Sequence, residues 1–394
     1  MIDIPSVEQT HSSGAVPRRG VTIVSASGAH LFDGTGRRWV DCSAAHGWAA
    51  LGHSHPAVTE AIRVQAGRLV MLTESATNDA RARWFAGLTE FLARDFPATG
   101  RGSLSRIAAA NSGAEAIEAA LKFARLRTGR PGFVAFTRGF HGRTFGALTA
   151  TAPSPRRDRY APLVPGFVHS PYNDLAAAAG VVRDDTAAII VEVIQGEGGV
   201  HEGSTEFLKG LEQLARERGA LLIVDEIQTG FGRTGRWFAS AWHGLNPDVI
   251  VLGKAIGGGL PLGAAVWRQE LGVFEPGMHG STFAGAPLVC AASVAALDAM
   301  TAEDLAARAL RMGEPVMARL REVGGMVRAV RGRGLMIGIE LKGRVAPVID
   351  KLMERGVWAL PAGLNVLRLL PPLNIPESDL DFALDAITEI LRGE

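Results

Sequence analysis

Lysine is scarce in this chain of 394 residues. Of its 41 basic residues only five are lysine, and arginine supplies the rest. The five are Lys122, Lys209, Lys254, Lys342 and Lys351. A reaction that requires a lysine amine therefore has few candidates, and their sequence surroundings can be compared directly.

Cysteine is scarcer still, since the chain contains only Cys42 and Cys290. Two distant cysteines form neither a disulfide framework nor the paired thiols of a zinc site, so we expect a cytoplasmic protein. The first residues lack the basic start and apolar run of a secretory signal. The weakly polar stretch 284–297 is too short for a membrane span. A net charge of +1 gives no reason to expect nucleic acid or an anionic membrane as a partner.

What the chain does contain, from about residue 57, is an alternation of short apolar runs with helix-period segments. The runs lack polar positions, as expected for strands that are covered on both faces. Strands and helices in alternation predict an α/β fold with a mostly parallel sheet flanked by helices. The expected strands are 107–110, 132–136, 187–194, 220–224 and 248–252, and the expected helices include 114–127 and 205–218.

The pattern after residue 281 differs and predicts a smaller α+β domain. It contains expected helices at 287–300, 305–323 and 377–391, and expected strands at 326–331, 335–341 and 366–370. A chain of this length also favours two domains. We predict a large domain over 51–285 and a small domain over 286–394. The N-terminal segment 1–50 should pack with the small domain, and residues 1–20 should be loosely ordered.

Ligands of parallel sheets bind beyond the carboxyl ends of the strands, so residues that follow the apolar runs are candidates for chemistry. Asp225 ends one run, and Lys254 follows the next run without an acidic neighbour. A carboxylate keeps a pyridinium nitrogen protonated, and apolar surroundings lower a lysine pKa so that the amine can form a Schiff base. Ser112 can cap a helix that begins at Gly113, where backbone amides bind phosphate.

These three features together indicate pyridoxal 5′-phosphate (PLP) bound to Lys254, although each alone has an ordinary structural explanation. An acid at a strand end often caps the next element, and Ser-Gly before a helix is commonly only a cap. The other four lysines lie in charged or amphipathic helices or in a polar turn, where surface roles suit them.

Two further sequence patterns are weaker evidence for a ligand site. The glycines of 230–235 satisfy G-x-G-x-x-G, but residues 225–229 separate them from the strand, and Asp248 opens the next strand instead of closing it. We therefore disfavour a dinucleotide site. His53 and His55 have no cluster of carboxylates or thiols beside them, so we expect a role in a loop and no metal.

Nine segments, in order, make the chain resemble the class-III aminotransferases of the fold-type-I PLP group, from about residue 28 almost to the C-terminus. The likeness is greatest to acetylornithine aminotransferases and to related enzymes of carrier-protein-linked lysine or ornithine pathways. The segments are LGHSHP (51–56), NSGAEAIEAALKFAR (111–125), FHGRT (140–144), PYND (171–174), VEVIQGEGGV (191–200), DEIQTGFGRTG (225–235), GKAIGGGLPLGA (253–264), HGSTF (279–283) and LRLLPPL (367–373).

The resemblance implies a role for individual residues. Lys254 and Asp225 match the Schiff-base lysine and the acid at the pyridine nitrogen, which are the catalytic pair. The other implied cofactor contacts are Ser112, Gly113 and Ala114 at the phosphate, Phe140 and Ile227 on the two ring faces, Gln228 near the phenolic oxygen, and Thr282 reaching the phosphate of the partner subunit in a homodimer with shared active sites. The implied substrate contacts are Arg143 and Arg368 for carboxylates, Glu197 covering Arg368, and Ser281.

The implied activity is transamination in arginine or lysine biosynthesis. The ω-amino group of a donor such as N-acetylornithine passes to 2-oxoglutarate, which gives a semialdehyde and glutamate. Alternative donors are ornithine, 4-aminobutyrate, and a lysine or ornithine group on a small acidic carrier protein that the arginines of 122–130 could contact. A PLP mutase or racemase and a non-catalytic regulatory protein are more remote, and the complete set Lys254, Asp225, Arg143 and Arg368 argues against the latter.

A few residues depart from the pattern of the family. Trp48 replaces a small aliphatic residue and Ala50 an asparagine, while Ala284 and Ala286 replace a glycine and an asparagine. None belongs to the implied cofactor set. Trp48 should lie near the substrate entrance, and it therefore leaves the identity of the donor open.

Overall fold

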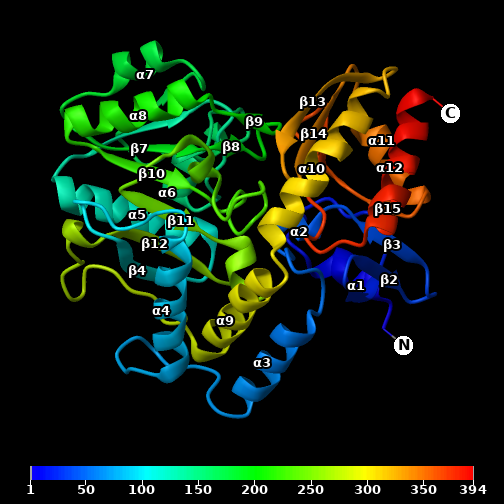
Figure 1. Ribbon diagram of the computed structural model, residues 1–394, viewed down its shortest axis with the longest axis horizontal. Coiled ribbons are helices and arrows are strands. Elements are labelled where there is room, and N and C mark those ends of the chain that lie inside the picture. Colours follow the sequence, from blue (N-terminus) through cyan, green and yellow to red (C-terminus); the bar gives the residue numbers. More distant parts are fainter. Residues whose placement is uncertain (1, 394) are drawn as a thin grey trace.

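The structure is a computed structural model that describes residues 2–393. Its centre is a seven-stranded sheet in the order β4-β12-β11-β10-β7-β5-β6 (Figure 1). The strands are β4 (Leu104–Ala110), β12 (Gly263–Arg268), β11 (Val249–Leu252), β10 (Leu221–Asp225), β7 (Thr186–Glu192), β5 (Gly132–Phe136) and β6 (Phe167–Ser170). All neighbouring pairs from β11 to β6 are parallel, and β12 is antiparallel to both of its neighbours.

The central strands are apolar throughout because helices cover both faces of the sheet. Every residue of β7, β10 and β11 is buried. On one face the sheet packs against α5 (Gly113–Thr128) and α6 (Phe145–Ala150), and on the other against α7 (Leu175–Val181) and α8 (Thr205–Arg218). A strand buried on both sides needs apolar residues at every position, which is the pattern that the sequence shows.

The helix α5 is positioned by its two caps. The hydroxyl of Ser112 accepts a hydrogen bond from the Glu115 amide at 3.2 Å, and Gly129 ends the helix in the left-handed conformation, with φ 68°. The helix starts directly after β4. Because β12 is antiparallel to both β4 and β11, the strands β4, β11 and β10 all run in the same direction. The amino end of α5 therefore lies at the edge of the sheet where β10 and β11 end.

The C-terminal part contains a second, antiparallel sheet in the order β13-β14-β17-β16. Its strands are β13 (Val327–Arg333), β14 (Met336–Leu341), β17 (Val366–Leu369) and β16 (Leu360–Ala362), and the helices of this part are α10 (Leu305–Arg321), α11 (Ala346–Glu354) and α12 (Glu377–Arg392). The helix α9 (Pro287–Ala302) packs against α3 (Pro56–Ala66) and α4 (Asp79–Ala93), and it leads from the large sheet to α10 (Figure 1).

The N-terminal strands join the C-terminal part. They form the sheet β1-β2-β3-β15 from β1 (Ile23–Ser27), β2 (His30–Asp33), β3 (Arg38–Asp41) and the late strand β15 (Val357–Trp358). The pairing of β3 with β15 is parallel, and Figure 1 shows these two strands next to each other in the C-terminal part of the molecule. The boundaries of the three predicted segments, 1–50, 51–285 and 286–394, stay a prediction, which this pairing supports.

The predicted α/β class is confirmed, with three differences in detail. The reversed strand β12 and the edge strand β6 were not expected. Residues 1–20 are not uniformly irregular, because α1 (Ile4–His11) forms behind an Asp3 cap that accepts from the Ser6 amide at 3.2 Å. This helix has no buried residue, so it leaves no apolar periodicity in the sequence.

Within residues 2–393 no helix is both long and apolar enough to cross a membrane. The short elements of the described residues include α2 (Ala44–Gly47), β8 (Ile194–Gln195), β9 (His201–Glu202) and the 3-10 helices η1 (Asp158–Tyr160), η2 (Ala239–His243), η3 (Lys254–Gly257) and η4 (Gln269–Leu271).

Candidate active site

Three of the predicted segments meet where α5 begins and where β10 and β11 end. A Cβ atom added to Gly113 would lie 2.8 Å from Ile227 Cδ1, and one added to Gly253 would lie 3.1 Å from Ile227 Cγ2. A side chain at Gly113 would require Ile227 to shift, and one at Gly253 would make a contact tighter than most real Cβ contacts. The structure therefore packs the start of α5, the residue before Lys254 and the segment after Asp225 against one another.

Asp225 forms a buried pair with His141. The Oδ2 atom of Asp225 lies 2.7 Å from His141 Nδ1, and Oδ1 accepts a hydrogen bond from the Ile227 amide at 3.0 Å. Burial opposes the positive charge on His141, but the carboxylate of Asp225 outweighs it and raises the histidine pKa. The sequence prediction missed His141, although it follows Phe140 directly.

Glu192 is a second buried acid at the same edge, and no pattern in the sequence indicates it. It ends β7 beside Asp225, its register partner at the end of β10. Its carboxylate accepts hydrogen bonds from the amides of Phe140 at 2.9 Å and Gly196 at 3.3 Å. Burial, together with the charge of Asp225, raises the pKa of Glu192 to about 7, although His141 acts in the opposite direction.

Lys254 has two unusual properties. Burial lowers its pKa, and Arg368 adds to this effect, while the carboxylates of Glu197 and Asp225 act against it. Its backbone φ is +50°, in the left-handed region, which costs a non-glycine residue about 1–2 kcal/mol. Such strain persists only where the surrounding structure fixes the residue, and it is common at functional sites.

These residues fit PLP. The amine with a lowered pKa suits an aldehyde, and the carboxylate of Asp225 suits a protonated ring nitrogen. The first amides of α5, at Gly113 and Ala114, have no acceptor within the helix and suit a phosphate. Gly113 and Gly253 both contact the side chain of Ile227, which therefore lies between the start of α5 and the residue before Lys254. We call the site formed by the start of α5 and the ends of β10 and β11 the PLP cradle. Among residues 2–393 there is no group of three or more His, Cys, Asp or Glu side chains that could hold a metal ion.

A buried arginine and a carboxylate form an ion pair near Lys254. Arg368 is fully buried, and its Nη1 atom lies 2.7 Å from Glu197 Oε1 and 3.0 Å from Gln228 Oε1. Its Nε has no hydrogen-bond partner among the described residues. Burial raises the pKa of Glu197, but His46 and Arg368 more than reverse this and hold it well below its ordinary value.

The backbone next to this pair is strained. Ala44, Ala45 and His46 are consecutive non-glycine residues in the left-handed region, with φ of 40°, 49° and 62°. Each such residue costs about 1–2 kcal/mol, and left-handed residues ordinarily occur singly. The turn is held by Asp41 Oδ1, which accepts from the amides of Ser43 at 2.8 Å and Ala44 at 3.1 Å.

Comparison with known families agrees with this geometry. The pattern of the family described as aminotransferase class-III matches residues 12–391. This chain belongs to the class-III aminotransferases. Members of this family depend on PLP, so the cofactor predicted from the sequence is confirmed. As an aminotransferase, the protein requires a small-molecule amino donor and an oxo-acid acceptor.

Two relatives and one solved structure are similar over nearly the whole chain. Acetylornithine aminotransferase of Methanopyrus kandleri is 43% identical over 376 residues, 95% of this chain and 95% of that protein. The [LysW]-aminoadipate semialdehyde transaminase of Deinococcus radiodurans is 42% identical over 395 residues, 98% of this chain and 90% of that one. An ornithine aminotransferase structure from Toxoplasma gondii, described with partial PLP occupancy at its active site, has a TM-score of 0.91 and 32% identity, covering 99% of this chain and 94% of that chain.

The remaining predicted site residues of this aminotransferase differ in their exposure. Phe140 is half-buried, whereas Arg143, Ser112 and Thr282 are exposed in the single chain. The hydroxyl of Ser281 accepts a hydrogen bond from Asn111 Nδ2 at 3.0 Å, beside the start of α5. Their proposed contacts with cofactor and substrate stay predictions.

The structure also shows the surroundings of the glycine-rich segment 230–235 and of His53 and His55, for which the sequence predicted no ligand site. Arg233, within the glycine-rich segment 230–235, donates hydrogen bonds to the carbonyls of Leu335 at 3.1 Å and Pro371 at 2.6 Å, so this segment connects the large sheet to the C-terminal part. His53 pairs with Asp41 at 2.8 Å and His55 with Glu303 at 2.9 Å, which are different carboxylates.

The departures from the family pattern are buried or close to Lys254. The side-chain nitrogen of Trp48 lies 3.8 Å from the position of a Cβ on Gly257, in the short turn that Lys254 begins. Ala50, Ala284 and Ala286 are buried. Trp48 is therefore the departure that can shape the space for substrate.

Proposed function

We propose that this aminotransferase transfers the ω-amino group of an N-acetylornithine-like donor to 2-oxoglutarate and produces a semialdehyde and glutamate. The observation that carries the proposal is the ion pair of Arg368 with Glu197, at 2.7 Å, beside a lysine with a lowered pKa. The names of the relatives from Methanopyrus kandleri and Deinococcus radiodurans, which both act on ω-amino or semialdehyde compounds, support the same substrate class.

The two substrates carry their carboxylates at different distances from the reacting carbon. In an ω-amino donor the carboxylate is remote, and the exposed Arg143 would bind it. In 2-oxoglutarate one carboxylate adjoins the reacting carbon, where Arg368 would bind it through the planar fork of the guanidinium. Glu197 neutralises Arg368 while the donor is bound, and it must leave Arg368 when the oxo acid arrives.

The residues of the chain divide the remaining work. PLP, when bound, supplies an electron sink for the carbon that loses its proton. Lys254 would act as the general base at this carbon, and its lowered pKa suits the task. Asp225 would hold the proton on the ring nitrogen, and His141, at 2.7 Å, keeps Asp225 in place.

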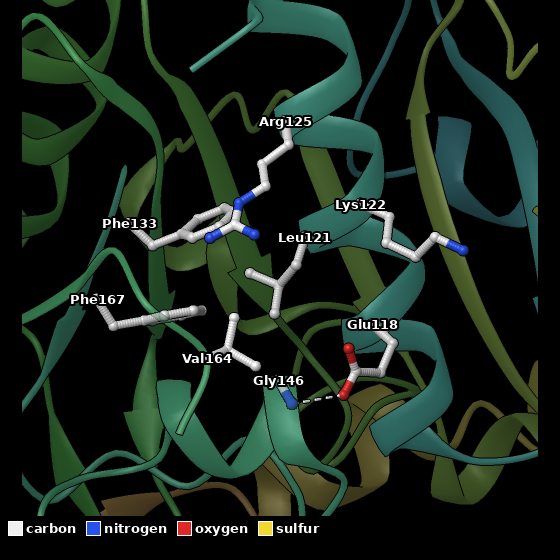
Figure 2. Close-up of a pocket in the computed structure, with 8 residues that line it drawn as sticks. All are labelled: Glu118, Leu121, Lys122, Arg125, Phe133, Gly146, Val164 and Phe167. Atoms are coloured by element: carbon white, nitrogen blue, oxygen red, sulfur yellow. Dashed lines mark hydrogen bonds between the residues drawn. The ribbon is translucent and has the colours of Figure 1, made fainter. Parts of the chain in front are cut away.

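A donor carried by a small acidic protein is a second candidate, and the name of the relative from Deinococcus radiodurans, [LysW]-aminoadipate semialdehyde transaminase, supports it. The predicted contact surface, the basic residues of 122–130, is less available than the sequence indicates. Arg125 donates to the carbonyls of Pro131 and Pro165 and lies over the Phe133 ring, as Figure 2 shows, and Arg130 donates to the carbonyl of Arg218. Only Lys122 and Arg127 of this set are exposed.

The pocket in Figure 2, of about 70 Å³, lies between α5, α6 and the strands β5 and β6. Glu118 borders it and accepts a hydrogen bond from the Gly146 amide at 2.8 Å, at the start of α6. This pocket is lined by neither Lys254 nor Asp225, so we place the reaction at the PLP cradle and not here.

The two arginines provide the test of the proposed function. Arg368→Lys should slow the half-reaction with 2-oxoglutarate much more than the half-reaction with N-acetylornithine, because lysine keeps the charge but loses the fork. Arg143→Lys, the matched control, should weaken both substrates, since each has a remote carboxylate. Stopped-flow absorbance measures each half-reaction separately. Equal slowing of both by Arg368→Lys would show that the pair with Glu197 is only structural.

The donor is decided by a parallel assay of free N-acetylornithine, ornithine, 4-aminobutyrate and a carrier-linked donor with the unmodified enzyme. We expect the highest kcat/KM for N-acetylornithine. A carrier-linked donor that exceeds it would favour the second candidate.

A further inference from the structure

His46 contacts both members of the Arg368–Glu197 pair through one ring nitrogen. Its Nδ1 atom lies 3.4 Å from Arg368 Nη2 and 3.9 Å from Glu197 Oε1. The same nitrogen thus faces a cation that donates and an anion that accepts. The side chain of His46 is more than half exposed, so it can exchange protons with solvent.

The protonation state of His46 determines which of the two partners suits it. A neutral imidazole with its proton on Nε2 offers the lone pair of Nδ1 to the guanidinium of Arg368. A protonated imidazole offers an N–H to Glu197 instead, and it repels the guanidinium. The two states therefore favour opposite arrangements of the same three side chains.

The backbone holds His46 at this position. It is the last of the three left-handed residues 44–46, and histidine is among the residue types that adopt this conformation more readily. A Cβ at the following Gly47 would be at ordinary contact distance, 4.0 Å from Gln228 Cγ and 3.8 Å from Leu370 Cδ1. The segment before the turn is tied to the strand of Arg368, because the amide of Leu370 donates to the carbonyl of Cys42 at 2.8 Å.

We propose that His46 is a positioning residue that makes the Arg368–Glu197 pair respond to protonation. When protonated, His46 draws Glu197 away from Arg368 and frees the guanidinium for the carboxylate beside the reacting carbon of 2-oxoglutarate. When neutral, it accepts from Arg368 and leaves the ion pair closed, as the ω-amino donor requires. This inference rests on the proposed function, because it assumes that Arg368 binds that carboxylate.

The charged groups that face this assembly come from three other segments. Glu197 lies between β8 and β9, Arg368 lies in β17, and Lys254 lies after β11 and lowers the pKa of Glu197 by its charge. Lys254 titrates in its own right, so a pH dependence in the unmodified enzyme alone does not identify His46. The test therefore compares variants that differ only at His46 and Glu197.

The experiment measures the affinity of the PLP-loaded enzyme for glutarate, a dicarboxylate that cannot react, by calorimetry at about pH 6 and about pH 8. The unmodified enzyme should bind glutarate at least about fivefold more tightly at the lower pH. In His46→Asn, which is neutral and tolerates the left-handed backbone, this ratio should fall toward one. His46→Gln is a second neutral variant, and His11→Gln on the exposed helix α1 is the control that should keep the ratio of the unmodified enzyme.

The Glu197→Gln background shows whether His46 acts through Glu197. Without the carboxylate, His46→Asn should change the pH ratio of glutarate affinity much less, because only its direct contact with Arg368 remains. An undiminished effect of His46→Asn in that background would overturn the inference, as would a His46→Asn enzyme that keeps the full pH ratio. The proposed function fails by a different result, the absence of 2-oxoglutarate-dependent turnover in the unmodified enzyme. Normal turnover with a glutarate affinity that is equal at both pH values refutes only the role of His46.

Discussion

At the scale of single residues, the buried pair of Asp225 and His141 is the counter-charge that we propose for the ring nitrogen of the cofactor. Asp225→Asn should keep PLP bound through Lys254 but lose most turnover, because the ring nitrogen no longer has a carboxylate. Removal of one partner from a buried charged pair costs about 2–5 kcal/mol, and a loss of this size in the transition state would slow turnover greatly. Single-turnover kinetics and the absorbance of the bound cofactor measure the two effects. Near-normal turnover would mean that another group keeps the ring protonated.

Sequence reasoning makes its most definite predictions at this scale where the chemistry allows few residue types. Lys254 stands out because only five lysines exist, and Asp225 because a carboxylate ends an apolar strand. His141, Glu192 and His46 were missed. Their roles depend on contacts between positions that are remote in sequence, such as the 2.7 Å contact across 84 residues between His141 and Asp225.

At the scale of elements, the aligned ends of β7 and β10 place two acids side by side, which predicts a pH dependence of stability. The folded protein raises the pKa of Glu192 to about 7, above its ordinary value of 4.5. The native state therefore holds more protons than the unfolded state between these values, so stability falls as the pH rises through this range. The raised pKa of His141 acts in the same direction, since its stabilisation is lost as the pH rises through its folded-state pKa.

This prediction concerns the cofactor-free protein, in which no ring nitrogen shares the acids. Thermal unfolding at about pH 5 and about pH 7 should show a lower Tm at the higher pH, and Glu192→Gln should reduce the difference. Glu90→Gln, on the exposed face of α4, is the control that should leave it unchanged. If Glu192→Gln and the unmodified protein lose equal stability, Glu192 is not the group that titrates.

The elements themselves were predictable where burial repeats along the chain. The helix at 205–218 and the strand at 132–136 have the predicted bounds, because each carries a complete apolar pattern. The direction of a strand leaves no such pattern, so the reversal of β12 was not foreseen. The helix α1 has no buried face, and only its Asp3 cap and the proline in its first turn mark it.

At the scale of the whole molecule, we expect a homodimer in which Thr282 of one subunit reaches the phosphate held by the other. Thr282 is exposed, and exposed apolar side chains adjoin it in sequence, with Met278 50% and Phe283 65% accessible. Apolar surface of this kind marks an interface in many proteins. The comparisons support the activity of the chain, and its assembly stays a prediction that the sequence of one subunit does not decide.

A mixture of two inactive chains tests the shared site. Lys254→Ala and Thr282→Ala subunits, when exchanged into hybrid dimers, give one site with both defects and one site with neither. Activity should then rise above that of either parent. Subunit exchange is verified by mass-tagged chains, and no recovery despite exchange would assign Thr282 to its own subunit.

The parallel pairing of β3 with β15 has a consequence for how the protein is made. The amide of Val40 donates to the carbonyl of Gly356 at 2.8 Å, and the amide of Cys42 donates to the carbonyl of Trp358 at 2.8 Å. A ribosome completes residues 38–42 long before it reaches residue 358. The edge of β3 therefore stays unpaired while the residues between β3 and β15, which include the whole large sheet, are synthesised. Closure of the sheet β1-β2-β3-β15 is thus a late event in the life of the nascent chain, and until then its open edge is available to chaperones and to neighbouring chains.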